Sequence, residues 1–232
     1  DSKYQRFYDE IVKKIKKEKI FTDKLHTLAY GTDASFYRLI PKIVIKTDNA
    51  KEVQDIIELS NSLNLSITFR AGGTSLSGQA ISDSILVITS RNFSNFKIAP
   101  DASYISLQPA LTGAQVNGLL ARYSKKIGPD PASINAAMIG GIAANNASGM
   151  CCGISQNSYK TLKSMKLIFA DGAKLDTGCS ESKDAFRKSH GDFLNDLKSF
   201  SQDTKNNEPL RAKIERKFKI KNTCGYSINA LI

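Results

Sequence analysis

The sequence predicts an α+β fold, and three features of the chain indicate it. An apolar run, PKIVIKT (41–47), is followed by an amphipathic stretch (50–64) and a second apolar run (65–70). In the middle stretch apolar residues recur every three or four positions, which is typical of a helix lying on a sheet. Two later segments, 96–109 and 162–178, alternate around turn residues and indicate antiparallel hairpins.

The first elements follow in order from these patterns. Residues 8–21 carry isoleucines at helical spacing among lysines, so we expect a helix there. Asp48 or Asn49 can cap the helix that follows the first strand. The strand–helix–strand order predicts parallel strands with a right-handed crossover. A further run, SILVITS (84–90), is continuously apolar, which indicates a strand buried on both faces.

The second half of the chain contains more turn and helix signals. PDAS (100–103) marks the turn of the first hairpin, and Thr112 can cap a helix over 112–124. Asp171–Gly172 is a strong signal for the turn of the second hairpin. Residues 181–219 are charged and mostly helical in pattern. The pattern changes near residues 92–100, which suggests two subdomains rather than two free domains.

Composition excludes several classes of protein. The apolar and charged shares, 41% and 24%, are ordinary for a globular protein, and no run of about 18 apolar residues occurs. The net charge of +11 gathers near both ends of the chain, where amphipathic helices facing solvent explain it better than a membrane-surface or partner-docking patch. The chain has no zinc-finger spacing and no run of aromatic residues interleaved with the basic ones, so we expect no nucleic-acid partner.

The cysteines and the start of the chain bear on location. Cys151 and Cys152 are adjacent, which suits neither a zinc site nor an ordinary disulfide, so reduced thiols are expected. The first residues are charged and show no signal-peptide pattern. We therefore expect a cytoplasmic protein, with peripheral contact to the inner face of the membrane left open.

The first glycine-rich loop, RAGGTSLSG (70–78), follows an apolar strand. Glycine is costly to order, so a cluster of it needs a reason such as positive φ or close approach to a ligand. Gly72 and Gly73 would leave backbone N–H groups free for an anion, with Thr74 and Ser75 adding hydroxyl donors. The loop lacks the lysine of a P-loop and the spacing of a dinucleotide-binding Rossmann loop, so both of those folds fit poorly.

The second loop, 128–149, has a different composition. Pro129 and Pro131 stiffen its start, Gly140 and Gly141 open a run of small residues, and asparagines with free amides follow. Such a helix start can bury an anion or a flat ring. Each loop alone could be a structural turn. Two in one chain favour a large ligand with a diphosphate.

Five motifs in order make the chain recognisable: YGTDASFYRLIPKIVIKT, TFRAGGTSLSGQA, GPDPASINAAMIGGIAANNASGM, LIFADG and KNTCGYSINAL. Together they resemble the FAD-binding domain of the vanillyl-alcohol oxidase / para-cresol methylhydroxylase (PCMH-type) flavoprotein superfamily. Within it the match is to the branch of D-lactate dehydrogenase and the glycolate oxidase subunit. The resemblance runs from residue 30 to the end of the chain. It implies a small βαβ subdomain plus a larger mixed-sheet subdomain flanked by helices.

The resemblance also assigns FAD-binding residues. The first loop would wrap the diphosphate, and the second group would line the isoalloxazine and ribityl side. The residues so assigned are Ala71, Gly72, Gly73, Thr74, Ser75, Leu76, Gly78, Gln79, Pro109, Pro129, Asp130, Ser133, Gly140, Gly141, Asn145, Asn146 and Gly149. Asn222 and Tyr226 are further candidates on the cofactor side. Met138 replaces a threonine common in this branch, which puts one hydroxyl contact in doubt. No histidine matches the covalent attachment position, so FAD is expected to bind non-covalently.

The resemblance implies an oxidoreductase that takes a hydride from a D-2-hydroxy acid to FAD and passes electrons to an iron–sulfur centre or quinone. The family's catalytic base and substrate clamp come largely from a later cap domain. No catalytic residue is therefore assigned within this chain, no metal site is expected, and an iron–sulfur cluster would belong to a region beyond residue 232. We expect this fragment alone to be inactive and to bind FAD weakly or not at all.

Two alternatives stay open from the sequence. One is another PCMH-type flavoenzyme, such as a peptidoglycan-precursor reductase or an ether-lipid synthase. The other is a basic module that binds membrane or nucleic acid, with structural glycine loops. For the domains we expect an N-terminal helical segment (1–30) and an FAD-binding domain (31–232). Within the latter the subdomains would cover about 31–95 and about 96–232.

Overall fold

The computed structural model describes residues 2–220 and 227–232, and the chain divides into two compact units. Unit 1 holds the described residues up to Lys126 together with Ser133–Gly141 and Ala170–Gly172. Unit 2 holds Ile127–Ala132, Ile142–Phe169 and the described residues from Ala173 on.

The centre of unit 1 is a four-stranded sheet. Its strands are β1 (Ile20–Phe21), β2 (Ile43–Thr47), β3 (Ile67–Arg70) and β4 (Ile85–Thr89), in the order β1-β2-β4-β3. β4 pairs in parallel with both β2 and β3, and β1 pairs antiparallel with β2. The predicted strands are confirmed, and β2 and β3 run parallel as expected, but β4 lies between them.

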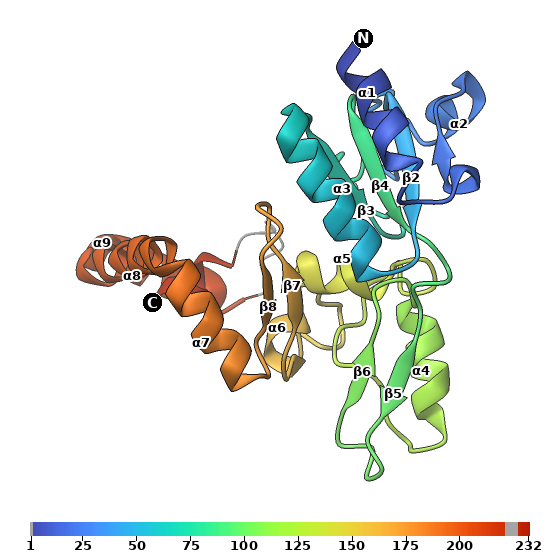
Figure 1. The fold of residues 1–232 in the computed structure, drawn as a ribbon. Helices are drawn as coiled ribbons and strands as arrows, with labels where there is room; N and C mark the ends of the chain where they lie inside the picture. The colour runs from blue at the N-terminus through green and yellow to red at the C-terminus, as the bar shows by residue number, and fades with distance from the viewer. Residues whose placement is uncertain (1, 221–226) are drawn as a thin grey trace. The chain divides into compact units, whose positions relative to one another are not determined.

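Helices α1 (Ser2–Ile11) and α3 (Ala50–Leu63) cover one face of this sheet (Figure 1). Phe7 and Ile11 of α1 and Ile56 of α3 are fully buried against Ile45 of β2. Alternate residues of β2 and β4 point to the other face, where Val44 and Leu86 are also buried. β4 is thus buried on both faces, as its continuous apolar run predicts.

The capping prediction for α3 is confirmed at Asn49, whose side chain accepts the N–H of Glu52. The predicted helix over 8–21 is wrong in its bounds. α1 ends at Ile11, and the chain then forms the short 3-10 helix η1 (Lys17–Lys19) before β1. Lysines crowd this segment, and like charges one turn apart destabilise a helix.

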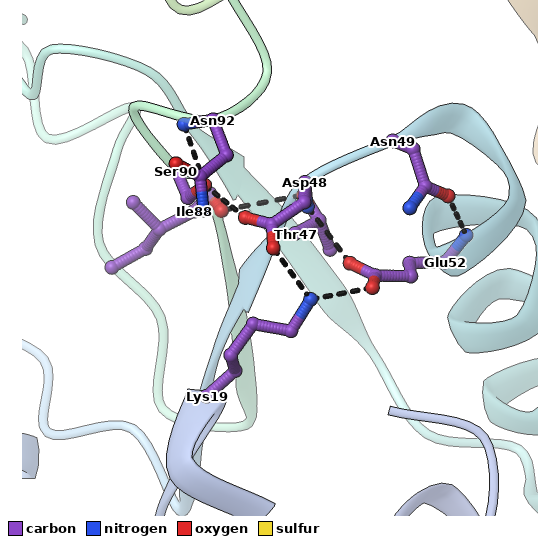
Figure 2. A network of polar contacts seen from close by, with 8 residues as sticks. All are labelled: Lys19, Thr47, Asp48, Asn49, Glu52, Ile88, Ser90 and Asn92. Carbon is purple, nitrogen blue, oxygen red and sulfur yellow. Dashed lines mark hydrogen bonds and ion pairs between the residues drawn. The ribbon is translucent and has the colours of Figure 1, made fainter. Parts of the chain in front are cut away.

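Lys19, the last residue of η1, joins a network of polar contacts with Asp48, which follows β2, and Glu52 of α3 (Figure 2). Its Nζ lies 2.9 Å from Asp48 Oδ2 and 2.5 Å from Glu52 Oε1. Asp48 also accepts a hydrogen bond from Ser90 Oγ, and its backbone N–H donates to Glu52 Oε2 at 2.8 Å. This network ties the N-terminal segment to the end of β2 and the start of α3.

Unit 1 also contains a hairpin, the helices α4 and α2, and the first residues of α5. β5 (Phe96–Ile98) pairs antiparallel with β6 (Ile105–Leu107), and α4 (Gly113–Ala121) follows. Thr112 caps α4 as predicted and forms a reciprocal capping box with Gln115. α2 (Lys24–Ala29) stands between β1 and β2 in the chain.

The remaining elements are mainly helical. α5 (Ile139–Ala144) lies within the second glycine-rich segment, and α6 (Ser158–Thr161) leads into the hairpin of β7 (Lys166–Ile168) and β8 (Lys174–Asp176). Gly172 has φ +88°, which confirms the predicted turn. The later helices are α7 (Ser180–Ser189), α8 (Gly191–Asn206), α9 (Glu208–Phe218) and the 3-10 helix η2 (Ile228–Leu231).

The compact units follow other bounds than the predicted subdomains, because residues 96–126 and 133–141 pack with the first part of the chain. The predicted segment 1–30 contains α1, η1 and α2 but also β1. The predicted subdomains therefore stay a prediction. Among the described residues no helix is long and apolar enough to cross a membrane.

Candidate functional site

The first glycine-rich loop begins directly after β3 and has an unusual backbone. Gly73 and Gly78 have φ values of +65° and +71°, which favour glycine. Gly72 has no room for a side chain, because a Cβ there would lie 2.3 Å from the carbonyl oxygen of Ala136. The loop therefore needs glycine for its turns at two positions and for close packing at a third.

Five consecutive backbone N–H groups of this loop, those of residues 72–76, meet no hydrogen-bond acceptor among the described residues. They are not deeply buried, since Gly72 to Ser75 are half-buried and Leu76 is exposed. A row of free N–H groups on a glycine-rich turn suits an anion with several oxygen atoms. This is the property that the sequence predicted for the loop.

One contact from elsewhere in unit 1 and several within the loop fix its conformation. The carbonyl of Gly73 accepts the N–H of Ala34 at 3.1 Å. Ser75 Oγ accepts the N–H groups of Ser77 and Gln79 and donates to Gln79 Oε1 at 3.0 Å. The Ser75 hydroxyl, a predicted donor to the diphosphate, is thus engaged within the loop.

The segment Ser133–Gly141 lies against this loop within unit 1. Ser133 starts a turn by accepting the N–H groups of Ala136 and Ala137. Gly140 donates its N–H to the carbonyl of Pro109 at 3.0 Å, and a Cβ on Gly140 would lie 2.8 Å from Pro109 Cβ.

Gly141 lies beside the start of the first loop, since its added Cβ would be 3.5 Å from Ala71 Cβ. The two glycine-rich stretches, far apart in the sequence, therefore meet. Unit 1 holds twelve of the seventeen residues assigned to FAD binding from the resemblance. These are Ala71, Gly72, Gly73, Thr74, Ser75, Leu76, Gly78, Gln79, Pro109, Ser133, Gly140 and Gly141.

The other predicted residues, Pro129, Asp130, Asn145, Asn146 and Gly149, belong to unit 2. Asp130 lies against Gly149 and accepts the N–H groups of Cys151 and Cys152, each at 3.2 Å. Burial raises the pKa of Asp130, but the hydrogen bonds from Cys152 and Cys151 outweigh it and hold the pKa below its ordinary value. Asp130 is therefore a carboxylate that organises its own loop.

The two asparagines differ. Asn146 has φ +44° and uses its amide within unit 2, accepting the Tyr159 N–H and donating to Ser227 Oγ at 2.9 Å. Asn145 lines a cavity of about 370 Å³ in unit 2, together with Asp130, Gly149 and the exposed Met150. Its volume falls within the range of small-molecule pockets. Of the two, Asn145 is the one placed to meet a ligand there.

The sequence reasoning missed residues that support the first loop. The guanidinium of Arg70 lies beside Gly73, and the backbone of Ala136 packs on Gly72. The carboxylate of Asp33 accepts the N–H of Ala80. For Arg70 the sequence did contain a signal of this supporting role, because an arginine stands there at the end of a predicted strand and directly before a glycine-rich loop. Predicted candidates Asn222 and Tyr226 lie outside the described residues. In the described part of the chain no group of histidine, cysteine or acidic residues could hold a metal ion.

One observation from this structure fits the predicted cofactor. The free N–H groups of residues 72–76 lie on a loop whose glycines remove the side chains that would obstruct an anion. A diphosphate supplies oxygen atoms that accept from several N–H groups at once. The residues present therefore suit the diphosphate of a dinucleotide such as FAD.

The chain is similar to several curated enzymes. It is 26% identical over 172 residues to D-2-hydroxyglutarate dehydrogenase of Haemophilus influenzae, covering 71% of this chain and 16% of that protein. It is 28% identical over 161 residues to glycolate oxidase subunit GlcD of Escherichia coli, covering 66% of this chain and 32% of that protein. It is 26% identical over 141 residues to D-lactate dehydrogenase of Archaeoglobus fulgidus, covering 59% of this chain and 31% of that protein. The chain thus spans less than a third of each of these relatives.

Solved structures share the fold. p-Cresol methylhydroxylase matches with a TM-score of 0.66 at 15% identity, over 78% of this chain and 37% of that chain. Alkyldihydroxyacetonephosphate synthase matches with a TM-score of 0.64 at 18% identity, over 77% of this chain and 37% of that chain. These matches confirm the predicted α+β fold of the PCMH type. Residues 41–178, more than half of the chain, match the family described as FAD binding domain, and the chain belongs to that family.

Proposed function

We propose that this domain binds FAD non-covalently for an oxidoreductase that oxidises a D-2-hydroxy acid. The observation that carries the proposal is the meeting of the two glycine-rich stretches beside a row of free N–H groups. Membership in the FAD binding domain family and the names of the relatives support it.

Each group of residues has a proposed role at the cofactor. Residues 71–79 hold the diphosphate through backbone N–H groups and the Thr74 hydroxyl. Pro109, Ser133, Gly140 and Gly141 shape the adjoining wall in unit 1. The unit 2 residues Pro129, Asp130, Asn145, Asn146 and Gly149 serve the ribityl and isoalloxazine part, where Asn145 lines a cavity.

FAD, when bound, supplies a two-electron acceptor for a hydride from the α-carbon of a hydroxy acid. The work of this domain is to bind and orient the cofactor and to exclude water from it. A hydroxy acid also needs a base for its hydroxyl proton and a cation for its carboxylate. We propose that these groups, and the path to a quinone or iron–sulfur acceptor, come from outside this domain.

The test uses the full chain, meaning the natural gene product that contains these 232 residues. Purified full chain should show the two-band absorbance of bound flavin and release intact FAD on denaturation. Anaerobic addition of D-lactate, D-2-hydroxyglutarate or the achiral glycolate should bleach the long-wavelength band, and L-lactate and L-2-hydroxyglutarate should not. A full chain that takes up no FAD would overturn the proposal. The 232 residues by themselves should show no turnover with an artificial acceptor.

The alternative of a basic binding module is less well supported. Three lysines of the N-terminal basic run pair with carboxylates: Lys13 with Glu10, Lys14 with Asp55 and Lys19 with both Asp48 and Glu52. Near the other end of the chain Arg211 pairs with Glu208. These pairs reduce the charge offered to an anionic surface, so we prefer the flavin-binding proposal.

A further inference from the structure

Arg70 is the last residue of β3 and stands directly before the first glycine-rich loop. Its side chain is half-buried, and its Nη1 donates to the carbonyl of Thr32 at 2.6 Å. The same Nη1 lies 3.5 Å from the carbonyl oxygen of Tyr30 and 3.5 Å from that of Ala80. One guanidinium nitrogen thus connects the segment before β2 with both ends of the loop.

The positive charge of Arg70 has no ion-pair partner among the described residues. The nearest acidic influence is Asp33, whose carboxylate accepts the N–H groups of Ser35 at 2.8 Å and Ala80 at 3.3 Å. Burial lowers the pKa of the Arg70 guanidinium, and the charge of Asp33 opposes that only in part. A half-buried cation without a paired anion is costly, and a bound anion would offset that cost.

The guanidinium also lies against the loop with the free N–H groups. A Cβ on Gly73 would lie 2.5 Å from Arg70 Nη2 and 2.7 Å from both Cζ and Nε. Neither Nη2 nor Nε donates to an acceptor in the part of the chain that the structure describes. The absence of a side chain on Gly73 therefore lets the guanidinium, whose Cζ also lies 5.7 Å from the centre of the Tyr30 ring, approach the loop that carries the free N–H groups of 72–76.

We propose that Arg70 is a positioning residue of this loop and supplies the fixed positive charge of its anion site. The Thr32 contact sets the loop conformation, and the charge favours an anion at the N–H groups of 72–76. That this anion is the diphosphate of FAD rests on the function proposed above. Arginine suits both tasks, because its planar fork donates in several directions and stays charged when partly buried.

The experiment separates the charge from the structural contact with two substitutions in the full chain. Arg70→Lys keeps the charge and loses the planar fork. Arg70→Gln loses the charge and keeps an N–H donor for the Thr32 carbonyl. Arg38→Gln is the matched control, because Arg38 is exposed and belongs to the same part of unit 1. The dissociation constant for FAD is measured by flavin fluorescence, and inorganic pyrophosphate is used as a probe in thermal melts of the apoprotein.

We expect Arg70→Gln to weaken FAD binding by about 10- to 100-fold, the usual effect of a lost hydrogen bond to a charged group. The same variant should lose the rise in melting temperature that pyrophosphate gives the parent protein. Arg70→Lys should keep that rise and lose less affinity, while Arg38→Gln should behave like the parent. A purely structural role would lower the melting temperature of both Arg70 variants without removing the pyrophosphate effect.

Other outcomes are also decisive. FAD affinity of Arg70→Gln within about twofold of the parent would overturn the inference and leave the proposed function standing. A parent that binds pyrophosphate in an Arg70-dependent way, but no FAD, would support the anion site and overturn the proposed function. If Arg70→Gln does not fold, Arg70→Lys decides, because loss of the pyrophosphate effect despite a retained charge would contradict the proposal.

Discussion

Gly72 packs its α-carbon against the carbonyl oxygen of Ala136, so closely that a Cβ would lie 2.3 Å from that oxygen. The contact joins the loop after β3 to the segment that precedes α5. Gly141 approaches the same loop less closely, since a Cβ there would lie 3.5 Å from Ala71 Cβ. The candidate cofactor site thus depends on residue 72 having no side chain.

Replacing Gly72 by alanine should therefore separate the two stretches. We expect Gly72→Ala to lose about 1–3 kcal/mol of unfolding free energy, as overpacking usually costs. FAD affinity should fall by about tenfold or more, since each 1.4 kcal/mol is a factor of ten in the dissociation constant. Urea denaturation of the apoprotein and flavin fluorescence titration measure the two effects.

Gly118 provides the control for this substitution. It lies in α4, and a Cβ there would meet nothing within 4 Å. Gly118→Ala should stabilise the protein by about 0.5–1 kcal/mol, because alanine favours a helix more than glycine does. Equal losses of affinity in both variants would contradict the role given to the Gly72 contact.

The local features of the fold could be predicted from the sequence. Asn49, Thr112 and the Asp171–Gly172 turn act on their own neighbours, so the residue types alone indicated the two caps and the hairpin. The glycines of the first loop likewise indicated its turns, and Gly73 and Gly78 have positive φ.

Contacts between distant segments could not be predicted in this way. Nothing in the pattern near Gly72 indicates Ala136, and nothing near Arg70 indicates the Thr32 carbonyl. The predicted end of the first helix was wrong for the same reason. The partners of Lys19 are Glu52 of α3 and Asp48 in the segment before α3, and the sequence near Lys19 does not indicate them. The meeting of the two loops was expected from a resemblance to a family and not from periodicity.

The cap of α4 should affect stability more than cofactor affinity. Thr112 Oγ1 accepts the N–H of Gln115 at 3.2 Å, so Thr112→Ala should cost about 1 kcal/mol of unfolding free energy. Thr112→Ser keeps the hydroxyl and should keep most of that stability. The backbone bonds from Gly113 to Ala137 and from Ile139 to Leu111 persist in both variants, so FAD affinity should not change. Loss of affinity in the alanine variant alone would show that the cap itself shapes the site.

Asp130 should stabilise its loop only while it is ionised. Its two carboxylate oxygens each accept one N–H, and asparagine has one such oxygen, so Asp130→Asn should cost about 1 kcal/mol at pH 7. Because the folded pKa of Asp130 is lowered, its contribution is present above the ordinary value near about 4 and is lost as pH falls. Urea midpoints of parent and variant should therefore differ at neutral pH and converge in acid.

Asp101 serves as the control for that change. It accepts both the N–H and the hydroxyl of Ser103 at the same oxygen, Oδ1, in the hairpin turn between β5 and β6. Asparagine can keep both bonds there, so Asp101→Asn should change the neutral-pH midpoint less than Asp130→Asn does. The reverse order would contradict the role given to the second oxygen of Asp130.

The network around Lys19 predicts how stability depends on pH. The Lys19 side chain is 12% exposed, and Lys19→Met would leave Asp48 and Glu52 without their cation. We expect a loss of about 2 kcal/mol at pH 7, below the 3–5 kcal/mol typical of fully buried pairs. Exposed Lys13, which pairs with Glu10, is the control, and Lys13→Met should show no measurable change.

The pKa shifts set the pH window of this effect. Burial lowers the pKa of Lys19, but the hydrogen bonds with Glu52 and Asp48 outweigh it and raise the pKa, so its contribution is complete below about 10.4 and fades as pH rises through the folded value. Burial raises the pKa of Asp48, but hydrogen bonds from Ser90 and Lys19 outweigh it and lower the pKa. Its contribution is therefore present above about 4 and fades in acid. The parent and Lys19→Met should thus differ most between these limits, and a difference that persists unchanged at pH 3 would mean that lost packing of the lysine, and not its charge, destabilises the variant.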